Sequence, residues 1–425
     1  MSNFTYPTQF KMNYLKVDGV DIMGLFLSLE IFENIFIPAV SGSLQFMDTD
    51  GGGFVDDNQI EFNEEIEFSI MNATEETMVF KGVLNGVASE MSNKNQKIYT
   101  VDFITKEMRK NDMTFVSEKI QDTPQNVVID MVERMEGKLN TTGSDGKKME
   151  FVAGRWKPLH IIKHVLTHGV SNNSDATNSG KNTDETARGT TGFLCWQTIG
   201  TQNEYRFCTV DELLKGSFEE HGKYKMQMNM RGDGIEHGKM SILEYNFKDM
   251  GDIQTKMKSG AFRCQLVSFD MDTGLYKEYE YDGSQEDNIM TDKQKEIVTG
   301  PTRIMMVPFT NDRFSKDCQA SPDNTGDQSR EYIAQNNARQ NTFNDQTGNF
   351  TLYPQFKIHA GDIIDVKINK IKSGENKNGT EENQKHSGKY VVKQVGHHFT
   401  VDNRAYTKVT TIRSTFQQDK QTARK

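Results

Sequence analysis

The chain contains 425 residues with a formal net charge of -10, and 35% of its residues are hydrophobic while 26% are charged. This length exceeds what one ordinary core accommodates, so it predicts two to four domains. The acidic balance argues against sequence-independent binding of duplex DNA, which needs a basic surface, but it is compatible with a protein that DNA only passes through. We expect no membrane span and no export signal, because no long apolar run is present.

Strict alternation of apolar and polar side chains marks the first hundred residues. The segments EIEFSI (residues 65–70) and YTVDF (residues 99–103) both place every apolar side chain on one face. This period of two predicts a half-buried antiparallel sheet. Turns are expected at the glycines of residues 51–53 and at Asn85 and Gly86, since Asn-Gly favours tight turns.

Two helices are predicted after this sheet. The first begins at Pro124 and ends at Gly137, with apolar residues at 128, 131, 132 and 135 forming one buried stripe. The second begins at Pro158 and ends at Gly169. Proline suits the first helical turn because its missing N–H has no partner there.

The remaining segments alternate between polar stretches and strand patterns. The polar segment 172–191 is expected to be mobile, and residues 284–348 are expected to form a polar linker with a helical insertion. Segments with the character of strands are 192–196 with 205–207 as a hairpin, 243–247, 277–281, 364–368, 390–393 and 406–413. The sequence therefore predicts a mainly β chain with α/β insertions.

Histidines at four-residue spacing are the most suggestive chemical pattern. His160 and His164 stand one helical turn apart and could share a zinc ion, whereas eight helical residues place His168 about 12 Å from His160. The pair lacks the glutamate of an HExxH motif, because Ile161 follows His160. We interpret the stripe as a solvated or interface surface of the helix. The alternative is a metal-dependent hydrolase that uses His160 and His164, and zinc that is lost in His164→Ala would support it.

Other possible sites are weaker. The acidic, glycine-rich segment 48–57 lacks the glutamate that a calcium-binding EF-hand loop has at its twelfth position, so it is interpreted as a turn. His397 and His398 lie in one strand and point to opposite faces. No motif for nucleotide binding or serine hydrolysis is present. We therefore predict no catalytic, cofactor-binding or metal-ligating residues, and a structural protein rather than an enzyme.

Cysteine usage agrees with synthesis in a reducing cytosol. Cys195, Cys208, Cys264 and Cys318 are far apart and form no CxxC pair. This spacing favours reduced thiols over a disulfide framework or a zinc ribbon.

Several blocks in a fixed order resemble one family. They are EIFENIFIP (30–38), VSGSLQFMD (40–48), YTVDFITKEM (99–108), GFLCWQT (192–198), YRFCTVDELL (205–214), GDIIDV (361–366), SGKYVV (387–392) and VGHHF (395–399). Taken together they resemble the baseplate hub proteins of T-even-type and cyanophage-type contractile-tailed bacteriophages. Cys195 and Cys208 stand where aromatic and serine residues are more usual in that family.

The resemblance implies a fold and a domain plan. It implies two tube-like antiparallel β-barrel domains in one chain, with three chains forming a pseudo-sixfold ring. The expected units are a first barrel at 1–110, an α/β insertion at 111–237, a second barrel at 238–283 plus 349–416, the linker 284–348 and a flexible tail at 417–425.

The resemblance also implies a function and partners. The chain would be a structural hub subunit that adapts the sixfold tail tube to the threefold central spike and forms the channel for tape-measure protein and DNA. Expected partners are further copies in a homotrimer, the spike, the tail tube protein and baseplate wedge proteins, without specific DNA binding and without a membrane. We expect assembly in the host cytoplasm and a final place in the virion. The alternatives are a tail-associated form of the metal-dependent hydrolase that uses His160 and His164, and a spike-like adaptor of a related injection system.

Overall fold

The computed structural model describes residues 4–49, 53–93, 96–142, 145–146, 148–172, 192–200, 204–216, 218–226, 240–249, 253–270, 274, 276–285, 292–309, 333–334, 337–338, 341, 346–369, 382–383 and 386–413. Four sheets hold the strands of these residues, and the largest has 13 strands. The prediction of a mainly β chain with α/β insertions is confirmed.

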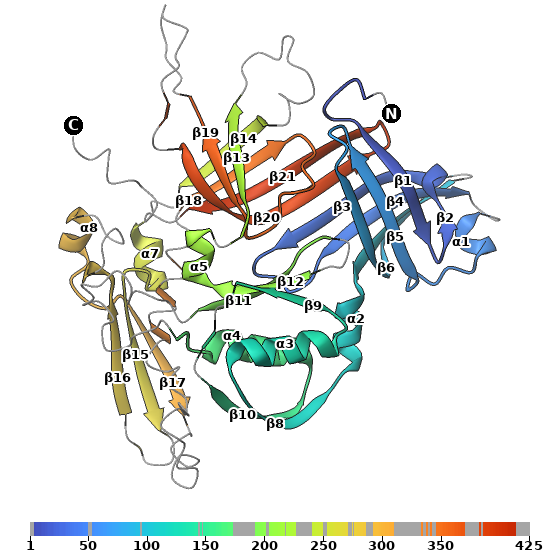
Figure 1. Ribbon diagram of the computed structural model, residues 1–425. Helices are drawn as coiled ribbons and strands as arrows, with labels where there is room; N and C mark the ends of the chain where they lie inside the picture. Colours follow the sequence, from blue (N-terminus) through green and yellow to red (C-terminus); the bar gives the residue numbers. More distant parts are fainter. Residues whose placement is uncertain are drawn as a thin grey trace, which may run out of the picture.

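Six strands from residue 220 onward close into a barrel (Figure 1). They pair in the order β19 (Ile363–Lys367), β13 (Glu220–Met226), β14 (Ser241–Asp249), β18 (Gln346–Leu352), β21 (Arg404–Arg413) and β20 (Gly388–Thr400), and β20 pairs back with β19. Apolar side chains that alternate along these strands fill the interior, including Tyr224, Phe350 and Tyr390. The barrel predicted for the C-terminal part of the chain is therefore closed by backbone pairing.

The N-terminal strands continue the same sheet beyond β20. They follow in the order β3 (Phe26–Asn34), β4 (Ser41–Thr49), β7 (Gln96–Thr105), β6 (Thr77–Asn93), β5 (Glu65–Asn72), β1 (Phe10–Val17) and β2 (Val20–Asp21). Their inner face encloses a core that contains Phe46, Phe68, Phe80 and Phe103. The short helices η1 (Met23–Leu25) and α1 (Phe54–Asp57) lie against this part. Backbone pairing among the described residues does not close these strands into a ring.

An α/β unit follows α2 (Lys106–Met113). Its strands form an antiparallel pair, β8 (Val116–Asp122) with β10 (Met149–Trp156), and a three-stranded sheet of β9 (Lys138–Thr141), β11 (Phe193–Gln197) and β12 (Glu204–Thr209). The helices α3 (Pro124–Arg134) and α4 (Pro158–His168) share one hydrophobic core with both sheets, and α5 (Val210–Lys215) follows β12. Both predicted helices and the predicted hairpin are confirmed, with each proline in the first helical turn.

A second insertion lies between β14 and β18. It contains α7 (Ile253–Ser259), β15 (Arg263–Asp270), β16 (Tyr276–Asp282), η2 (Gly283–Gln285), α8 (Asp292–Ile297) and β17 (Arg303–Phe309). The strands form a separate sheet in the order β16, β15, β17. One face packs on a small core around Phe262 and Leu266, whereas Ile304 and Met306 on the other face are exposed.

Strand membership differs from the expected units in two places. β13 was expected in the α/β insertion at 111–237 but belongs to the closed barrel, where it pairs in parallel with β14 and β19. β15 and β16 were expected in the second barrel, and the segment of β17 in the polar linker 284–348, but the three form their own sheet. Alternation shows that a segment is a strand but does not show which distant segment it pairs with, so these positions could not be derived from the pattern.

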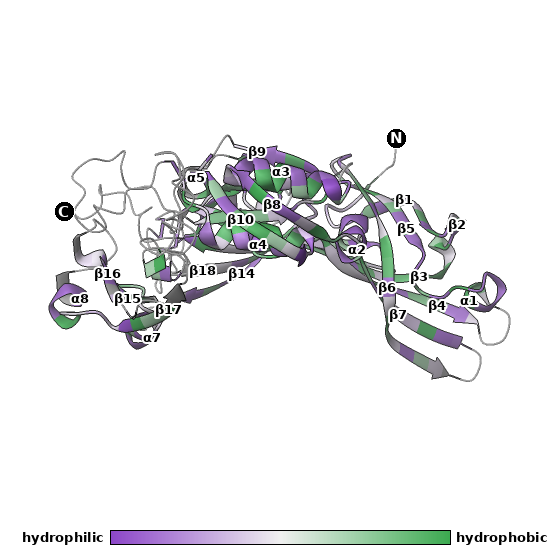
Figure 2. Ribbon diagram, turned by 90° about the horizontal axis from the view of Figure 1, so that it is seen from below, coloured by the Kyte–Doolittle hydropathy of each residue, from purple (hydrophilic) through white to green (hydrophobic). Residues whose placement is uncertain are grey.

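The turn predicted at Asn85 and Gly86 is wrong. Gly86 has a φ of 100° and lies at a register shift between Leu84 and Val87, and β6 continues through it to Asn93. Glycine at positive φ inside a strand produces a β-bulge, which keeps the strand going while it changes direction. The result is a long hairpin of β6 and β7 that extends from one end of the molecule (Figure 2).

Some expectations lie outside the described residues. These include nearly all of the segment 172–191, much of 284–348, the tail 417–425, and Cys318. The other three cysteines are buried and free. No helix within the described ranges is long and apolar enough to span a membrane.

Candidate functional site

The sequence predicts the histidine stripe of α4 as a solvated or interface surface. His160 is exposed, whereas His164 and His168 are half-buried and pack partly against aromatic rings. The ring of His164 lies 4.5 Å from that of Phe151 and stacks on His168 at 4.1 Å, while His160 contacts Trp156. Burial lowers the pKa of His164 to about 4. Nδ1 of His168 lies 3.0 Å from the carbonyl oxygen of His164, so that nitrogen already has a partner.

The acidic, glycine-rich segment 48–57 forms a turn, and the two adjacent histidines at 397 and 398 lie on opposite faces of their strand. Asp48 accepts hydrogen bonds from the backbone N–H groups of Phe54 and Val55 at the start of α1, so its carboxylate organises the turn after the glycines. His397 is buried and His398 pairs with Glu30 at 2.9 Å on the outer face, so the two histidines point to opposite faces as expected.

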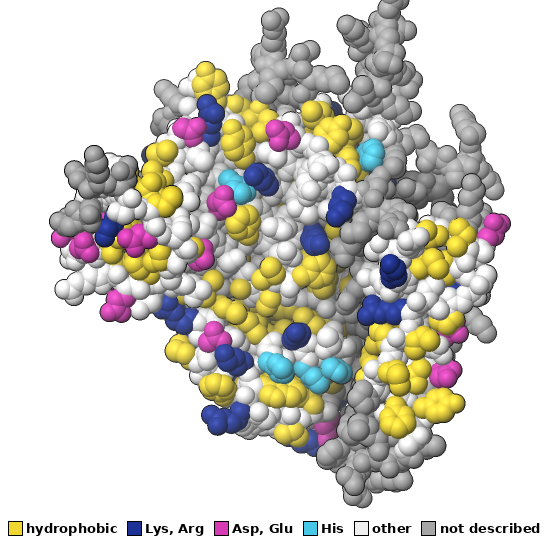
Figure 3. Space-filling view, turned by 180° about the vertical axis from the view of Figure 1, so that it is seen from behind, with side chains coloured by type: hydrophobic (Ala, Val, Ile, Leu, Met, Phe, Trp, Pro, Cys, Tyr) yellow, Lys and Arg dark blue, Asp and Glu magenta, His cyan; other side chains and the backbone are white. Residues whose placement is uncertain are grey.

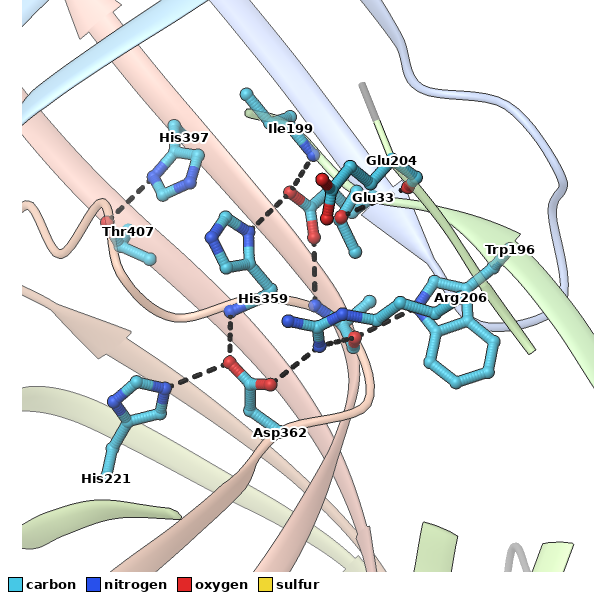
Figure 4. Close-up of polar contacts among 12 residues, drawn as sticks. Glu33, Trp196, Ile199, Glu204, Arg206, His221, His359, Asp362, His397 and Thr407 are labelled. Carbon is cyan, nitrogen blue, oxygen red and sulfur yellow. Dashed lines mark hydrogen bonds and ion pairs between the residues drawn. The ribbon is translucent and has the colours of Figure 1, made fainter. Parts of the chain in front are cut away.

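A buried polar cluster lies where the three main parts of the chain meet (Figure 4). We call it the junction network and define it as Glu33, Arg206, His221, His359 and Asp362. Glu33 belongs to β3, Arg206 to β12 and His221 to β13, while the other two lie in the segment before β19. Glu33 and Asp362 have no exposed surface. Buried carboxylates are costly unless they are fully hydrogen-bonded, so their partners determine whether the junction is stable.

Asp362 is held from three directions. Its Oδ1 accepts a hydrogen bond from Nη1 of Arg206 at 2.7 Å, and its Oδ2 lies 2.8 Å from the backbone N of His359 and 2.9 Å from Nε2 of His221. The guanidinium of Arg206 also stacks over Phe218 at 4.7 Å. Burial alone would raise the pKa of Asp362, but the hydrogen bond from His221 and the charge of Arg206 hold this pKa below its usual value.

Glu33 connects the N-terminal sheet with the barrel. Its carboxylate accepts hydrogen bonds from the backbone N of Ile199 at 2.6 Å and of Ala360 at 2.9 Å, and Nδ1 of His359 lies 3.0 Å away. Burial opposes a charge on His359, but the adjacent Glu33 carboxylate outweighs burial and holds the pKa of His359 above its usual value. A protonated His359 therefore forms an ion pair with Glu33.

The backbone at residues 360–361 provides the last set of contacts. Nε1 of Trp196 and Nη1 of Arg206 both donate to the carbonyl of Ala360, at 2.9 and 3.1 Å. Gly361 has a φ of 92°, and a Cβ added there would lie 2.4 Å from Cζ2 of Trp196. Only glycine combines this backbone conformation with so close an approach of the indole.

One group of residues has the composition of a metal site. Ligand atoms of Glu219, His221 and Asp362 lie within 4.8 Å of one another, and this is the one such group of three or more among the residues described. Both oxygens of Asp362 already accept hydrogen bonds, and one of the donors is the cationic Arg206. A metal cation would have to replace these donors beside a positive charge, so the donor set fits an ion-pair network and does not fit a metal centre.

Three of the blocks that resemble one family meet at this junction. Glu33, Arg206 and Asp362 each come from a different block. Gln197, from the GFLCWQT block, accepts hydrogen bonds from Oγ1 of Thr105 at 2.7 Å and from the backbone N of Val40 at 3.3 Å, which lie in two further blocks. The junction network was not predicted from the sequence. The one signal for it was that Glu33, Arg206 and Asp362 each stand inside a block that resembles the family.

The chemistry of the network is that of a connector. Its carboxylates are saturated by donors, and its members are contributed by the N-terminal sheet, the α/β unit and the barrel. Such a network fixes how the three parts are joined, because each buried charge is satisfied in only one arrangement. On the face seen from behind (Figure 3), the Lys and Arg side chains of the described residues are interspersed with Asp and Glu, so these residues form no continuous basic track for a nucleic acid there.

No protein-family model matches the chain, and no curated protein matches it. Among solved structures it is similar to a tail protein from Neisseria meningitidis, with a TM-score of 0.54 and 9% identity over 95% of this chain and 97% of that chain. It is also similar to the 43 kDa tail protein of prophage MuSo2 from Shewanella oneidensis, with a TM-score of 0.53 and 8% identity over 95% and 98%. The chain therefore has the fold of these tail proteins along nearly its whole length.

The buried His397 makes the fold sensitive to acid. Burial lowers its pKa from 6.5 to about 3, and its Nδ1 lies 3.0 Å from Oγ1 of Thr407. The unfolded chain takes up this proton near pH 6.5 and the folded chain does not, so stability is lost as the pH falls below about 6.5. We expect His397→Gln to flatten the decline of the denaturation midpoint between pH 6.5 and 4.

A second histidine serves as a control of opposite sign. The pKa of His359 is raised, so its stabilising contribution is complete below about pH 6.5 and is lost as the pH rises through the raised value. His359→Gln should change the pH dependence above 6.5 and leave the acid decline in place. An unchanged acid decline in His397→Gln would contradict the role of that ring.

Proposed function

We propose that the chain is the hub subunit of a contractile-tail baseplate, acting as a structural ring component and not as an enzyme. The observation that carries this proposal is the single hydrogen-bonded sheet that runs from the closed barrel into the N-terminal strands. Two barrel-like units joined in one chain would allow three copies to present six units, which matches a sixfold tube to a threefold spike.

The outer face of this shared sheet supports a channel. The residues that point away from the two cores include Ser28, Gln45 and Thr100, which are linked by hydrogen bonds of 3.0 and 3.2 Å. Thr410 and Asn349 make a similar link of 2.9 Å on the barrel side. Charged residues of both signs lie on the same face, among them Asp102 on β7 and Lys408 on β21, so a polyanion passing along it would meet repulsion as well as attraction. Tape-measure protein and DNA are the proposed contents of the channel.

A hub subunit of this kind would contact four kinds of partner. Further copies would form the ring, the tail tube protein would sit on one side, the central spike on the other, and wedge proteins outside. The chain would be assembled in the host cytoplasm and remain in the virion. The similarity to tail proteins supports this placement by fold.

The size of the assembly tests the proposal. In analytical ultracentrifugation at micromolar concentration, we expect one species with three times the 48.4 kDa mass of the chain, alone or with its spike partner. A chain that stays monomeric under both conditions would contradict the hub function. A trimer with a central channel in electron micrographs would support it.

A further inference from the structure

The second insertion carries a small sheet with one exposed face. Its strands pair in the order β16, β15, β17, with β16 antiparallel and β17 parallel to β15. Every second side chain of these strands, among them Leu266, Tyr281 and Met305, packs on the core of the insertion itself. Because successive side chains of a strand point to opposite faces, the residues between them form a second face, which we call the insertion face.

The insertion face gathers large apolar side chains. It consists of Arg263, Gln265, Val267 and Phe269 on β15, Tyr276, Glu278, Glu280 and Asp282 on β16, and Ile304 and Met306 on β17. The register places Val267 beside Met306, and Phe269 beside Tyr276. Tyr276, Ile304 and Met306 are 65%, 62% and 73% accessible. In Figure 3 this sheet lies at the lower right, where hydrophobic side chains cluster. Single exposed apolar residues are common, but a cluster of them is typical of a docking surface.

The charge on the insertion face is negative. Glu278 and Glu280 follow one another on the exposed side of β16, and both are exposed. Among the described side chains of this face, Arg263 is the one cation, and it pairs with Asp282 at 2.8 Å, so its charge is balanced. The face therefore combines an apolar part over β15 and β17 with an acidic row along β16. A complementary surface needs apolar side chains with basic residues along one side.

The segment that follows β17 in the chain does not have this composition. Residues 311–331 contain Phe314 as their single large apolar side chain, with five acidic residues against three basic ones. Such a segment would bring like charges to the acidic row and little apolar surface to Ile304 and Met306. The composition therefore favours a segment of another protein as the occupant of the face.

We propose that the insertion face binds an amphipathic helix of another protein, in which lysine or arginine lies along one side of an apolar row. Adjacent strands lie about 4.8 Å apart, so three strands span about 10 Å, the width of a single helix. The apolar row would cover Val267, Ile304 and Met306, and the basic side chains would reach Glu278 and Glu280. The insertion face lies outside the large sheet, so this binding does not depend on the hub function.

Two labelled helical peptides of about 18 residues test the apolar part of the face. Both carry the same row of leucines, which lysines flank in one peptide and glutamates in the other, and fluorescence anisotropy measures their binding to the purified full-length chain. We expect the lysine peptide to bind, and Met306→Glu to weaken its affinity about tenfold because a charge would be buried in the contact. The matched control is Val152→Glu, at a valine of the α/β unit that is 67% exposed, and it should leave the affinity unchanged.

Charge reversal separates docking from general attraction to an acidic chain. Glu278→Lys combined with Glu280→Lys should weaken binding of the lysine peptide about tenfold and make the glutamate peptide the better ligand. Glu133→Lys combined with Glu136→Lys makes the same change of net charge at α3 and should alter neither affinity. Equal effects of the two double variants would overturn the proposal, as would a lysine peptide that does not bind the unmodified chain.

Two further measurements detect other occupants of the insertion face. Loss of self-association in Met306→Glu would assign the face to a second copy, and peptide binding that appears only after residues 311–331 are replaced by a short glycine-serine linker would assign it to that segment. Either result would overturn the proposal. A trimer that binds neither peptide would also overturn it while leaving the hub function intact. A monomer that binds the lysine peptide would support the proposal and remove the hub function.

Discussion

Replacing Arg206 with methionine is expected to lower the free energy of unfolding by about 3 to 5 kcal/mol, the usual effect of removing one partner from a buried ion pair. Arg206 donates to the fully buried Asp362 at 2.7 Å and to the carbonyl of Ala360 at 3.1 Å. The variant leaves one oxygen of Asp362 without its donor in an environment that water does not reach. The measurement is the shift of the urea denaturation curve at pH 7.

A surface arginine provides the comparison. Arg134 on α3 pairs with Glu118 and Asp130, and its side chain is 36% exposed. Because exposed ion pairs contribute little, Arg134→Met should cost less than about 1 kcal/mol. If the two variants unfolded at the same urea concentration, the junction network would not be the connection that its geometry indicates.

Replacing Gly361 with alanine is expected to destabilise the protein by about 2 to 5 kcal/mol. The left-handed backbone at this position costs a residue with a Cβ about 1 to 2 kcal/mol. The remainder comes from overpacking, since the new Cβ would lie 2.4 Å from the buried Trp196 ring and force the indole or the backbone to move. Tryptophan fluorescence during denaturation would report both the stability and the displaced ring.

Gly19 separates the two contributions. It also has a positive φ, 79°, but nothing lies within 4 Å of the position of a Cβ. Gly19→Ala therefore carries only the backbone cost, about 1 to 2 kcal/mol. An equal loss of stability in Gly19→Ala and Gly361→Ala would show that the contact with Trp196 contributes nothing.

The sequence by itself determined the local elements. Pro124 and Pro158 mark the first turns of two helices because proline lacks the N–H that has no partner there. The alternation in 65–70 and 99–103 identifies two strands whose apolar side chains enter the same core. These assignments depend on side-chain periodicity and proline geometry over a few residues, which a sequence displays directly.

Only the tertiary structure decided how these elements are joined. His359 meets Glu33 across 326 positions of sequence, and Arg206 meets Asp362 across 156. Likewise, β13 enters the barrel and β6 passes through Gly86 because of partners that lie far away along the chain. Burial converts ordinary polar residues into a network whose charges need one another, and backbone pairing sets which strands are neighbours in the large sheet. Neither property is visible in local periodicity, because both arise from contacts between segments that only folding brings together.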